Sequence, residues 1–420
     1  MGRSHRVARW VPLALLALGA AACGETKLKS APPPPPMSGG DASTPVLPAT
    51  MPAPPFLSLV AGGDVSCGIA GEGDLYCWGR NDLGQVGDGS GVIQMLPVPV
   101  GKGHKWLAVA PGGSHTCALA EKGSTYCWGS GLFAEIGNDT IGQSLAPIHV
   151  ATVPPFVSIA SGENHSCGLT GAGTLWCWGD NRHGELGRGD TLPAHNAVPV
   201  SPGITFRSMT LSGHATCAVT TDAKLYCWGL DNGGALGYLA TSPCEESGNA
   251  VSLCALSLRR TAGDSLVRHA ALGYEHACAL TPGGTARCWG TNGAGELGTG
   301  SRDSAGPGPV AGDLHFSALA AGGAFTCGLL KEGDLYCWGT NAEGQTGTGA
   351  GADSPLPAIV QSPSRFISVS AGHQHACAVT TEHVGYCWGD DSFGQVGGVA
   401  KRRSFTPDLV VFPRADSTVQ

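Results

Sequence analysis

The sequence predicts an all-β protein, a seven-bladed β-propeller of four-stranded antiparallel blades. Seven times a cysteine is followed ten positions later by a second cysteine that runs into Trp-Gly, and successive first cysteines lie 50, 50, 50, 61, 49 and 50 residues apart. The chain is rich in Gly (66) and Pro (29), and only 13% of its residues are charged. Such a composition is typical of short strands joined by tight turns, and a repeat array shares one continuous core.

Each repeat follows the same order of elements. In the first copy a bulky residue, Phe56, begins the expected innermost strand, and residues 65–70 and 74–79 form a hairpin around a three-residue turn. The proline-marked stretch Pro97–Val100 is the expected outer strand, where proline is tolerated. Alternation along the hairpin places Cys67 and Leu75 on one face and Trp78 on the other. Because both faces are apolar, radial stacking of the blades is expected to cover them.

The cysteine spacing predicts one disulfide within each hairpin. Cys67 directly faces Cys77, and opposed positions of a hairpin bring the Cβ atoms close enough for a bridge. Zinc is the weaker interpretation, because two cysteines with this spacing do not match a zinc finger. The density of cysteines points to an oxidising compartment. The expected pairs are Cys67 with Cys77, Cys117 with Cys127, Cys167 with Cys177, Cys217 with Cys227, Cys244 with Cys254, Cys278 with Cys288, Cys327 with Cys337 and Cys377 with Cys387.

The N-terminus is typical of an exported protein. Residues 1–22 combine a basic start with an apolar run that is too short to span a bilayer. The following stretch resembles a bacterial lipobox, so Cys23 is the expected lipidated residue, with plain signal cleavage as the alternative. Gly24 after the cysteine implies the outer membrane of a Gram-negative cell. Residues 23–55 are expected to be a proline-rich spacer.

Residues 56–413 are assigned to the seven repeats and residues 414–420 to a C-terminal tail. The sequence is compatible with two ways of closing the ring. Either Thr406 to Phe412 alone completes the last blade, or Pro45-Val46 contributes a strand from the other terminus.

The fourth repeat departs from the others. Between Tyr238 and Arg260 it carries about eleven extra residues, which include Cys244 and Cys254 and are expected to form a disulfide-linked loop. Function usually lies in loops carried by rigid scaffolds. Cys244, Glu245, Glu246 and Cys254 are therefore the candidate partner-binding element, with a neutral insertion as the alternative.

The remaining recurrent polar residues favour structural roles. Histidine stands two positions before the first cysteine in four repeats, but Val65, Ala215 and Phe325 replace it elsewhere. Glutamine or glutamate recurs in the Gly-rich turn, where bonding within the turn is the expected role. No catalytic, cofactor-binding or metal-binding residue is predicted. Removal of the three arginines of the signal takes the formal charge from −8 to −11, so no nucleic acid is expected as a partner.

The string from Cys77 to Gly89, CWGRNDLGQVGDG, resembles the repeat of the regulator-of-chromosome-condensation family. Close variants begin at Trp178, Trp289 and Trp338. The resemblance covers about Phe56 to Pro413 and implies a seven-bladed propeller. Its founding members are guanine-nucleotide exchange factors, whereas this chain looks exported and acidic. Secreted bacterial members include an inhibitor of β-lactamases, so the resemblance implies that the scaffold can serve as a binding surface.

The expected function is therefore that of an extracytoplasmic, monomeric scaffold that binds an unknown protein partner and is not an enzyme. It is expected to contact the membrane only through its lipid anchor. Two alternatives stay open, an exported inhibitor of a specific enzyme and a propeller enzyme with its site at the mouth of the channel. Guanine-nucleotide exchange is the least expected function.

Overall fold

A computed structural model describes residues 50–138, 142–151, 153–247, 250–261, 266–398 and 402–413 of the chain. The expected signal, the lipidated Cys23, Pro45-Val46 and the tail 414–420 lie outside these residues. Within them, the one helix is a 3-10 turn, Glu121–Gly123, and no helix there has the length and apolar character needed to cross a membrane.

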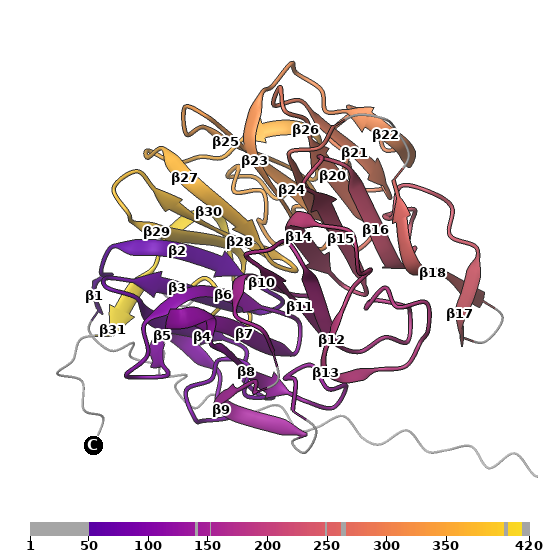
Figure 1. Ribbon diagram of the computed structural model, residues 1–420. Coiled ribbons are helices and arrows are strands. Elements are labelled where there is room, and N and C mark those ends of the chain that lie inside the picture. Colours follow the sequence, from indigo (N-terminus) through magenta and orange to yellow (C-terminus); the bar gives the residue numbers. More distant parts are fainter. Residues whose placement is uncertain are drawn as a thin grey trace, which may run out of the picture. The chain divides into compact units, whose positions relative to one another are not determined.

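The predicted seven-bladed propeller of four-stranded antiparallel blades is confirmed (Figure 1). In blade 1, β2 (Phe56–Ala61), β3 (Val65–Ala70), β4 (Asp74–Gly79) and β5 (Gln94–Val100) pair in chain order. The register is the expected one, because Cys67 pairs with Cys77 and Ile69 with Leu75. The turn residues Gly71 and Gly73 adopt positive φ angles, a conformation that glycine adopts without strain.

Blades 2, 3, 5, 6 and 7 repeat this order, and blade 4 has an additional strand. Blade 2 contains β6 (Trp106–Pro111), β7 (His115–Ala120), β8 (Thr125–Ser130) and β9 (Gln143–His149), and blade 3 contains β10 (Phe156–Ser161), β11 (His165–Thr170), β12 (Leu175–Gly179) and β13 (Ala194–Pro199). Blade 4 contains β14 (Phe206–Ser212), β15 (Ala215–Thr220), β16 (Leu225–Leu230), β17 (Ser242–Ser247) and β18 (Ala250–Arg260). Blade 5 contains β19 (His269–Leu272), β20 (His276–Leu280), β21 (Ala286–Gly290) and β22 (Ala305–Pro309). Blade 6 contains β23 (Phe316–Ala321), β24 (Phe325–Leu330), β25 (Leu335–Gly339) and β26 (Ser354–Ile359), and blade 7 contains β27 (Phe366–Ala371), β28 (His375–Thr380), β29 (Gly385–Asp390) and β30 (Arg403–Leu409).

The core lies between the blades, as the two apolar faces of each hairpin require. Cys67, Ile69 and Leu75 of blade 1 are buried against Trp106 and Trp128 of blade 2. The opposite face of blade 1, with its own tryptophan and innermost strand, packs against the cysteine face of blade 7. Each blade therefore covers one face of its neighbour, and burial of this apolar surface is the main force that holds the ring together.

The ring closes where blade 7 contacts blade 1, and the first and last colours of the chain lie side by side in Figure 1. Among the described residues, β30 is the fourth strand of blade 7, as in the first of the two expected closures, but it spans Arg403–Leu409 instead of Thr406 to Phe412. The N-terminal side contributes as well, because β1 (Thr50–Pro52) pairs with β31 (Val411–Pro413) outside the blade. The spacer assignment is therefore wrong for residues 50–52, since their backbone finds a partner strand.

Strands adjacent in a blade are antiparallel, so the first-to-second and third-to-fourth connections of every blade end at the same face of the propeller. We call this face the turn face. It carries the glycine turns that precede each first cysteine and the Gly-rich loops that follow each Trp-Gly. The second-to-third connections end at the opposite face.

Candidate functional site

All eight expected cysteine pairs are joined by disulfides in the structure. The seven pairs within the hairpins have Cα atoms 4.1 Å apart, and these cysteines are buried between blades. Their disulfides join Cys67 to Cys77, Cys117 to Cys127, Cys167 to Cys177, Cys217 to Cys227, Cys278 to Cys288, Cys327 to Cys337 and Cys377 to Cys387. The eighth disulfide, between Cys244 and Cys254, has a Cα separation of 5.8 Å and joins β17 to β18 in blade 4.

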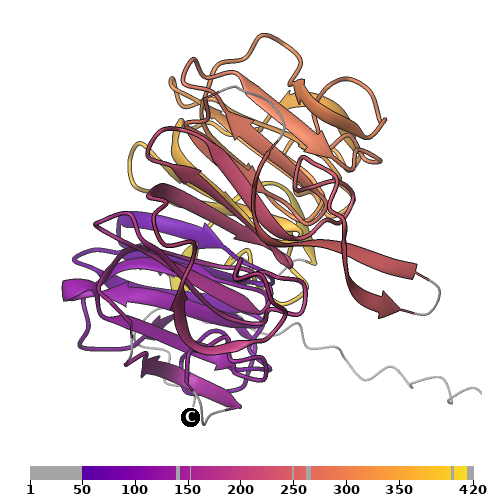
Figure 2. The same cartoon turned by 45° about the vertical axis from the view of Figure 1, so that its right-hand side comes forward.

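The extra residues of blade 4 form a hairpin of strands, where the sequence predicted a loop. Blade 4 has the strand order β14-β15-β16-β18-β17, and the hairpin of β17 and β18 extends from the propeller in Figure 2. The inner half of β18 completes the blade, because Ala255 pairs with Gly229 and Arg260 with Tyr226. The expectation of a projecting, disulfide-linked loop is therefore wrong for this half, since blade 4 has no other fourth strand among the described residues.

The outer half of the hairpin adds a fifth strand. Glu245 pairs with Ser252 and Glu246 with Val251, so the candidate partner-binding residues lie on β17 and on the strand beside it. No other strand of the described residues pairs with β17. Among these residues, β17 is therefore an edge strand of blade 4.

The base of the hairpin is held by side-chain contacts. The hydroxyl of Tyr238 donates a hydrogen bond of 2.6 Å to the carbonyl of Cys227. The guanidinium of Arg259 lies 4.6 Å from the centre of the Tyr238 ring. These contacts join the segment that precedes β17 to β16 and to the inner half of β18.

The recurrent histidines bond between blades, as the structural interpretation expected. The Nε2 atom of each lies within hydrogen-bond distance of a hydroxyl in the next blade, in the pairs His115–Ser166, His165–Thr216, His276–Thr326 and His375–Ser66. Burial lowers the pKa of all four, to between about 3 and about 4. They are therefore neutral structural groups at neutral pH.

The recurrent Gln and Glu side chains bond within their own turns. Gln85, for example, accepts a hydrogen bond of 2.8 Å from the backbone N–H of Leu83. Glu135 accepts the equivalent bond of 2.7 Å from Phe133. Burial raises the pKa of Glu135, so this carboxylate takes up a proton more readily than an exposed one.

A channel with a volume of about 310 Å³ is lined by the innermost strands and by the glycine turns of the turn face. The position four residues before the first cysteine is glycine in four blades, but it is Glu163 in blade 3, Tyr274 in blade 5 and His373 in blade 7. The Tyr274 hydroxyl is hydrogen-bonded to both Glu163 and His373. Nε2 of His373 lies 3.3 Å from a carboxylate oxygen of Glu163. Three side chains of different blades therefore meet at one end of the channel.

We call Glu163, Tyr274 and His373 the channel-mouth cluster. Their contacts explain the pKa shifts of Glu163 and Tyr274. Burial alone would raise the pKa of Glu163, but the hydrogen bonds from His373 and Tyr274 lower it to about 2. Burial and the neighbouring Glu163 carboxylate raise the pKa of Tyr274. A second cavity of about 390 Å³ shares Tyr274 and His373 with the channel. The cluster thus stands between the channel and a pocket on the turn face.

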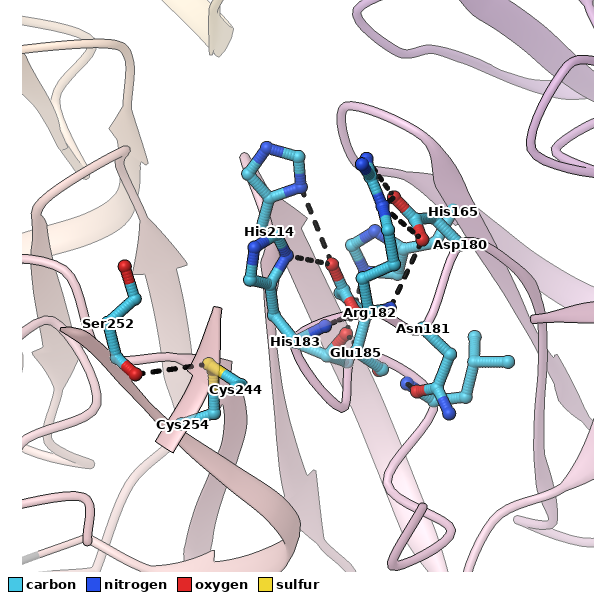
Figure 3. Close-up of polar contacts among 12 residues, drawn as sticks. His165, Asp180, Asn181, Arg182, His183, Glu185, His214, Cys244, Ser252 and Cys254 are labelled. Atoms are coloured by element: carbon cyan, nitrogen blue, oxygen red, sulfur yellow. Dashed lines mark hydrogen bonds and ion pairs between the residues drawn. A yellow bond between two sulfur atoms is a disulfide. The ribbon is translucent and has the colours of Figure 1, made fainter. Parts of the chain in front are cut away.

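A second cluster lies between blades 3 and 4, where the Gly-rich loop of blade 3 meets the first turn of blade 4. Nδ1 of His183 is 2.8 Å from Oε1 of Glu185, and Nδ1 of His214 is 3.4 Å from the same oxygen (Figure 3). Burial alone would raise the pKa of Glu185, but the two histidines hold it well below its usual range. These three residues form a group that can hold a metal ion.

The sequence alone did not reveal either cluster. The recurrent histidines and turn residues bond as the structural interpretation expected, and Glu185 is one of these recurrent turn residues, but the other members of the two clusters break the repeat. An alignment of the seven copies would identify them as exceptions at otherwise glycine or variable positions. It would not show that they meet.

Family and structure comparisons agree on the architecture. Residues 17–317 match the model of the "RCC1-like domain", and residues 332–379 match that of the "Regulator of chromosome condensation (RCC1) repeat". A further repeat model matches residues 316–345 and 366–395. No curated protein sequence matches the chain.

Solved structures show the same fold at low identity. Human WBSCR16 is 21% identical with a TM-score of 0.68, over 77% of this chain and 86% of that one. Prp20p from Saccharomyces cerevisiae is 22% identical with a TM-score of 0.67, over 78% and 84% of the two chains. Yeast RCC1 (Prp20) in its complex with Kap60 is 21% identical with a TM-score of 0.71, over 85% of each chain.

Proposed function

We propose that this chain, which belongs to the RCC1-like domain family, is an extracytoplasmic, lipid-anchored propeller that binds a protein partner. The proposed export and lipid anchoring rest on the signal-like residues 1–22 and on the number of cysteines left outside disulfides. The eight disulfides use sixteen cysteines, and Cys23 of the lipobox-like stretch is the one that remains.

The observation that carries the binding function is the fifth strand of blade 4. An unpaired edge strand on a rigid sheet can take an extended segment of a partner by β-strand addition. Here the edge is β17, and the disulfide between Cys244 and Cys254 joins it to the strand beside it. A constrained edge loses little conformational entropy on binding. Yeast Prp20p, which shares the fold, has binding properties towards Gsp1p and histones, so such a propeller can serve as a protein-binding surface.

Crosslinking in cells followed by mass spectrometry tests the proposal. The variant must spare the inner half of β18, so residues 242–253 are replaced by a short Gly-Ser linker together with Cys254→Ala. We expect the native protein to capture a partner that this variant loses. An unchanged melting temperature would show that the propeller of the variant is intact.

A matched control changes side chains on the face of the propeller opposite the turn face. Leu107 and Val157 are exposed residues near the start of the innermost strands of blades 2 and 3, so Leu107→Ser with Val157→Ser alters that face. Loss of the partner in this control, with retention by the trimmed variant, would assign binding to the other face and refute the proposed site. Capture of an enzyme in a one-to-one complex that abolishes its activity would identify the protein as an inhibitor.

A second function, binding or turnover of a small molecule at the channel mouth, is favoured by the cluster of Glu163, Tyr274 and His373. These groups converge beside two cavities, an arrangement typical of ligand sites. A small-ligand screen by thermal shift tests it, with Glu163→Gln as the paired variant. Ligands that stabilise the native protein and not the variant would support this function, and equal shifts in both would oppose it.

A further inference from the structure

We propose that His183, Glu185 and His214 bind one divalent transition-metal ion, with zinc as the expected occupant. The ion would join the Gly-rich loop of blade 3, which supplies the first two ligands, to the first turn of blade 4, which supplies the third. Imidazole nitrogen and carboxylate oxygen are the ligands of many zinc sites. The inference is independent of the proposed protein-binding function.

The geometry of the three side chains matches such a site. One carboxylate oxygen, Oε1 of Glu185, faces both Nδ1 atoms at 2.8 and 3.4 Å. All three ligand atoms lie within 4.8 Å of one another. Zinc bonds of about 2.0–2.1 Å in tetrahedral geometry place ligand atoms about 3.4 Å apart, so small side-chain shifts are enough to accommodate the ion. The two imidazole rings converge on the carboxylate from one side in Figure 3.

The other oxygen of Glu185 has a separate role. Oε2 accepts a hydrogen bond of 2.9 Å from the backbone N–H of His183, which is the turn bond that each Gln or Glu at this position makes. This bond fixes the carboxylate and leaves Oε1 directed at the histidines. A ligand held in this way needs little reorganisation to bind an ion.

The burial of the group favours a bound cation. The side chain of Glu185 is fully buried, that of His183 is 4% exposed and that of His214 is 27% exposed. Nδ1 of His214 is itself buried and lacks a hydrogen bond of good geometry. A cation would satisfy this nitrogen and would compensate the buried carboxylate. The partial exposure of His214 leaves an approach from solvent.

The other blades provide a second, independent observation. The position of His183 is apolar or small in five of the other six blades and glutamate in blade 6, and the position of His214 never carries a second histidine. The two substitutions occur together, on facing elements of adjacent blades. The turn bond alone does not require them, because it also forms in blades 1, 6 and 7, where leucine, glutamate and phenylalanine stand at the position of His183.

The repeat itself supplies the variants for a test. Glu185→Gln introduces the residue of blades 1, 6 and 7, and His183→Phe introduces the residue of blades 2 and 7, so both changes are compatible with the turn. Glu135→Gln makes the same substitution in blade 2, where Phe133 stands at the position of His183, and is the matched control. His214→Ala removes the most exposed ligand and is the least disruptive change.

The measurement is a calorimetric titration of zinc into protein that lacks a histidine tag and has been stripped of metal with a chelator. We expect one zinc ion per chain for the native protein and for Glu135→Gln. Loss of a ligand should weaken binding at least about tenfold in Glu185→Gln, His183→Phe and His214→Ala, since even groups behind the ligands contribute that much. Cobalt in place of zinc should show a visible spectrum without thiolate bands, because the bridged cysteines cannot act as ligands.

Two results would overturn the inference. One is the absence of stoichiometric zinc binding to the native protein. The other is equal affinity in the native protein and in correctly folded His214→Ala and Glu185→Gln, which would place the ion elsewhere. The melting temperature without metal distinguishes a folding defect from a lost ligand, and if the interior variants fail to fold, His214→Ala alone decides the question.

Discussion

At the scale of single residues, one contact explains most of the repeat motif. The indole N–H of each Trp-Gly tryptophan donates to a backbone carbonyl in the Gly-rich turn of the preceding blade, as in Trp128 to Gln85 at 2.9 Å. The same bond recurs in all seven blades. The motif thus joins neighbouring blades, because the turn of one copy accepts a bond from the tryptophan of the next.

The glycine two residues after the bonded carbonyl is required by this contact. Gly87 has a φ of +82°, and a Cβ atom there would lie 2.4 Å from Nε1 of Trp128. Gly87→Ala should therefore lower the free energy of unfolding by about 2 kcal/mol or more, measured by denaturant titration. Gly89→Ala is the control, because its φ is +89° but nothing lies within 4 Å of its Cβ. Equal losses in both variants would contradict a steric role for the tryptophan.

The buried histidines predict a pH dependence of stability. Burial lowers the pKa of His276 to about 4 in the folded protein, whereas the unfolded chain takes up this proton near pH ~6.5. The free energy of unfolding should therefore be greatest above about pH 6.5 and should fall as the pH drops toward about 4. Each such histidine contributes up to about 1.4 kcal/mol per pH unit.

The variant His276→Phe tests this dependence. Blade 6 carries Phe325 at the same position, fully buried, and Thr326 would keep its bond of 3.0 Å to the carbonyl of Glu296. Denaturant titrations from neutral to acidic pH should show a shallower decline in the variant than in the native protein. An identical decline in the free energy of unfolding would mean that His276 does not contribute to the pH dependence of stability.

At the scale of elements, the disulfides fall into two kinds. Seven lie inside hairpins whose strands are already held by both neighbouring blades. The eighth, between Cys244 and Cys254, holds a strand that pairs with no described strand on its outer side. Removal of a disulfide of the first kind is therefore expected to affect global stability, and removal of the eighth is expected to affect the β17–β18 hairpin.

Removal of one disulfide of each kind tests this difference. Cys217→Ala with Cys227→Ala opens a bridge between residues ten positions apart in a buried hairpin and should cost at most about 2 to 3 kcal/mol of global stability. Cys244→Ala with Cys254→Ala should leave the melting temperature nearly unchanged and should speed limited proteolysis within the β17–β18 hairpin. A similar fall in melting temperature for both variants would show that the hairpin is part of the global folding unit.

At the scale of the whole molecule, stability depends on closing the ring. Blade 7 packs on blade 1, and the two ends of the propeller pair outside them through β1 and β31. Phe412 of β31 is 7% exposed. Its ring centre lies 4.8 Å from that of Tyr76 and 6.1 Å from that of Phe56.

Phe412→Ala should weaken this closure. The loss of a buried aromatic ring costs about 3 to 5 kcal/mol, and the opening should be local to the junction. Hydrogen exchange is expected to accelerate in β2, β3, β28 and β29 before it accelerates in blade 4. Phe405→Ala, on the outer strand of blade 7, is the control, and faster exchange spread evenly over all blades would contradict a local closure.

The sequence by itself determined the repeat, the number of blades, the register of each hairpin and the partners of its cysteines. These features are local, because alternation along a strand and the length of a turn decide which side chains face each other. Three of the four histidine contacts also follow the period, since each of these histidines is followed about fifty residues later by the serine or threonine that becomes its partner.

Only the tertiary structure decided which residues meet in the two clusters. Tyr274 meets Glu163 and His373 across separations of 111 and 99 residues, because a closed ring directs the same position of every blade toward one axis. His214 reaches Glu185 because the first turn of one blade abuts the Gly-rich loop of the blade before it. The extra residues of blade 4 became a strand pair because β16 needed a neighbour, a requirement set by the sheet and not by the local sequence.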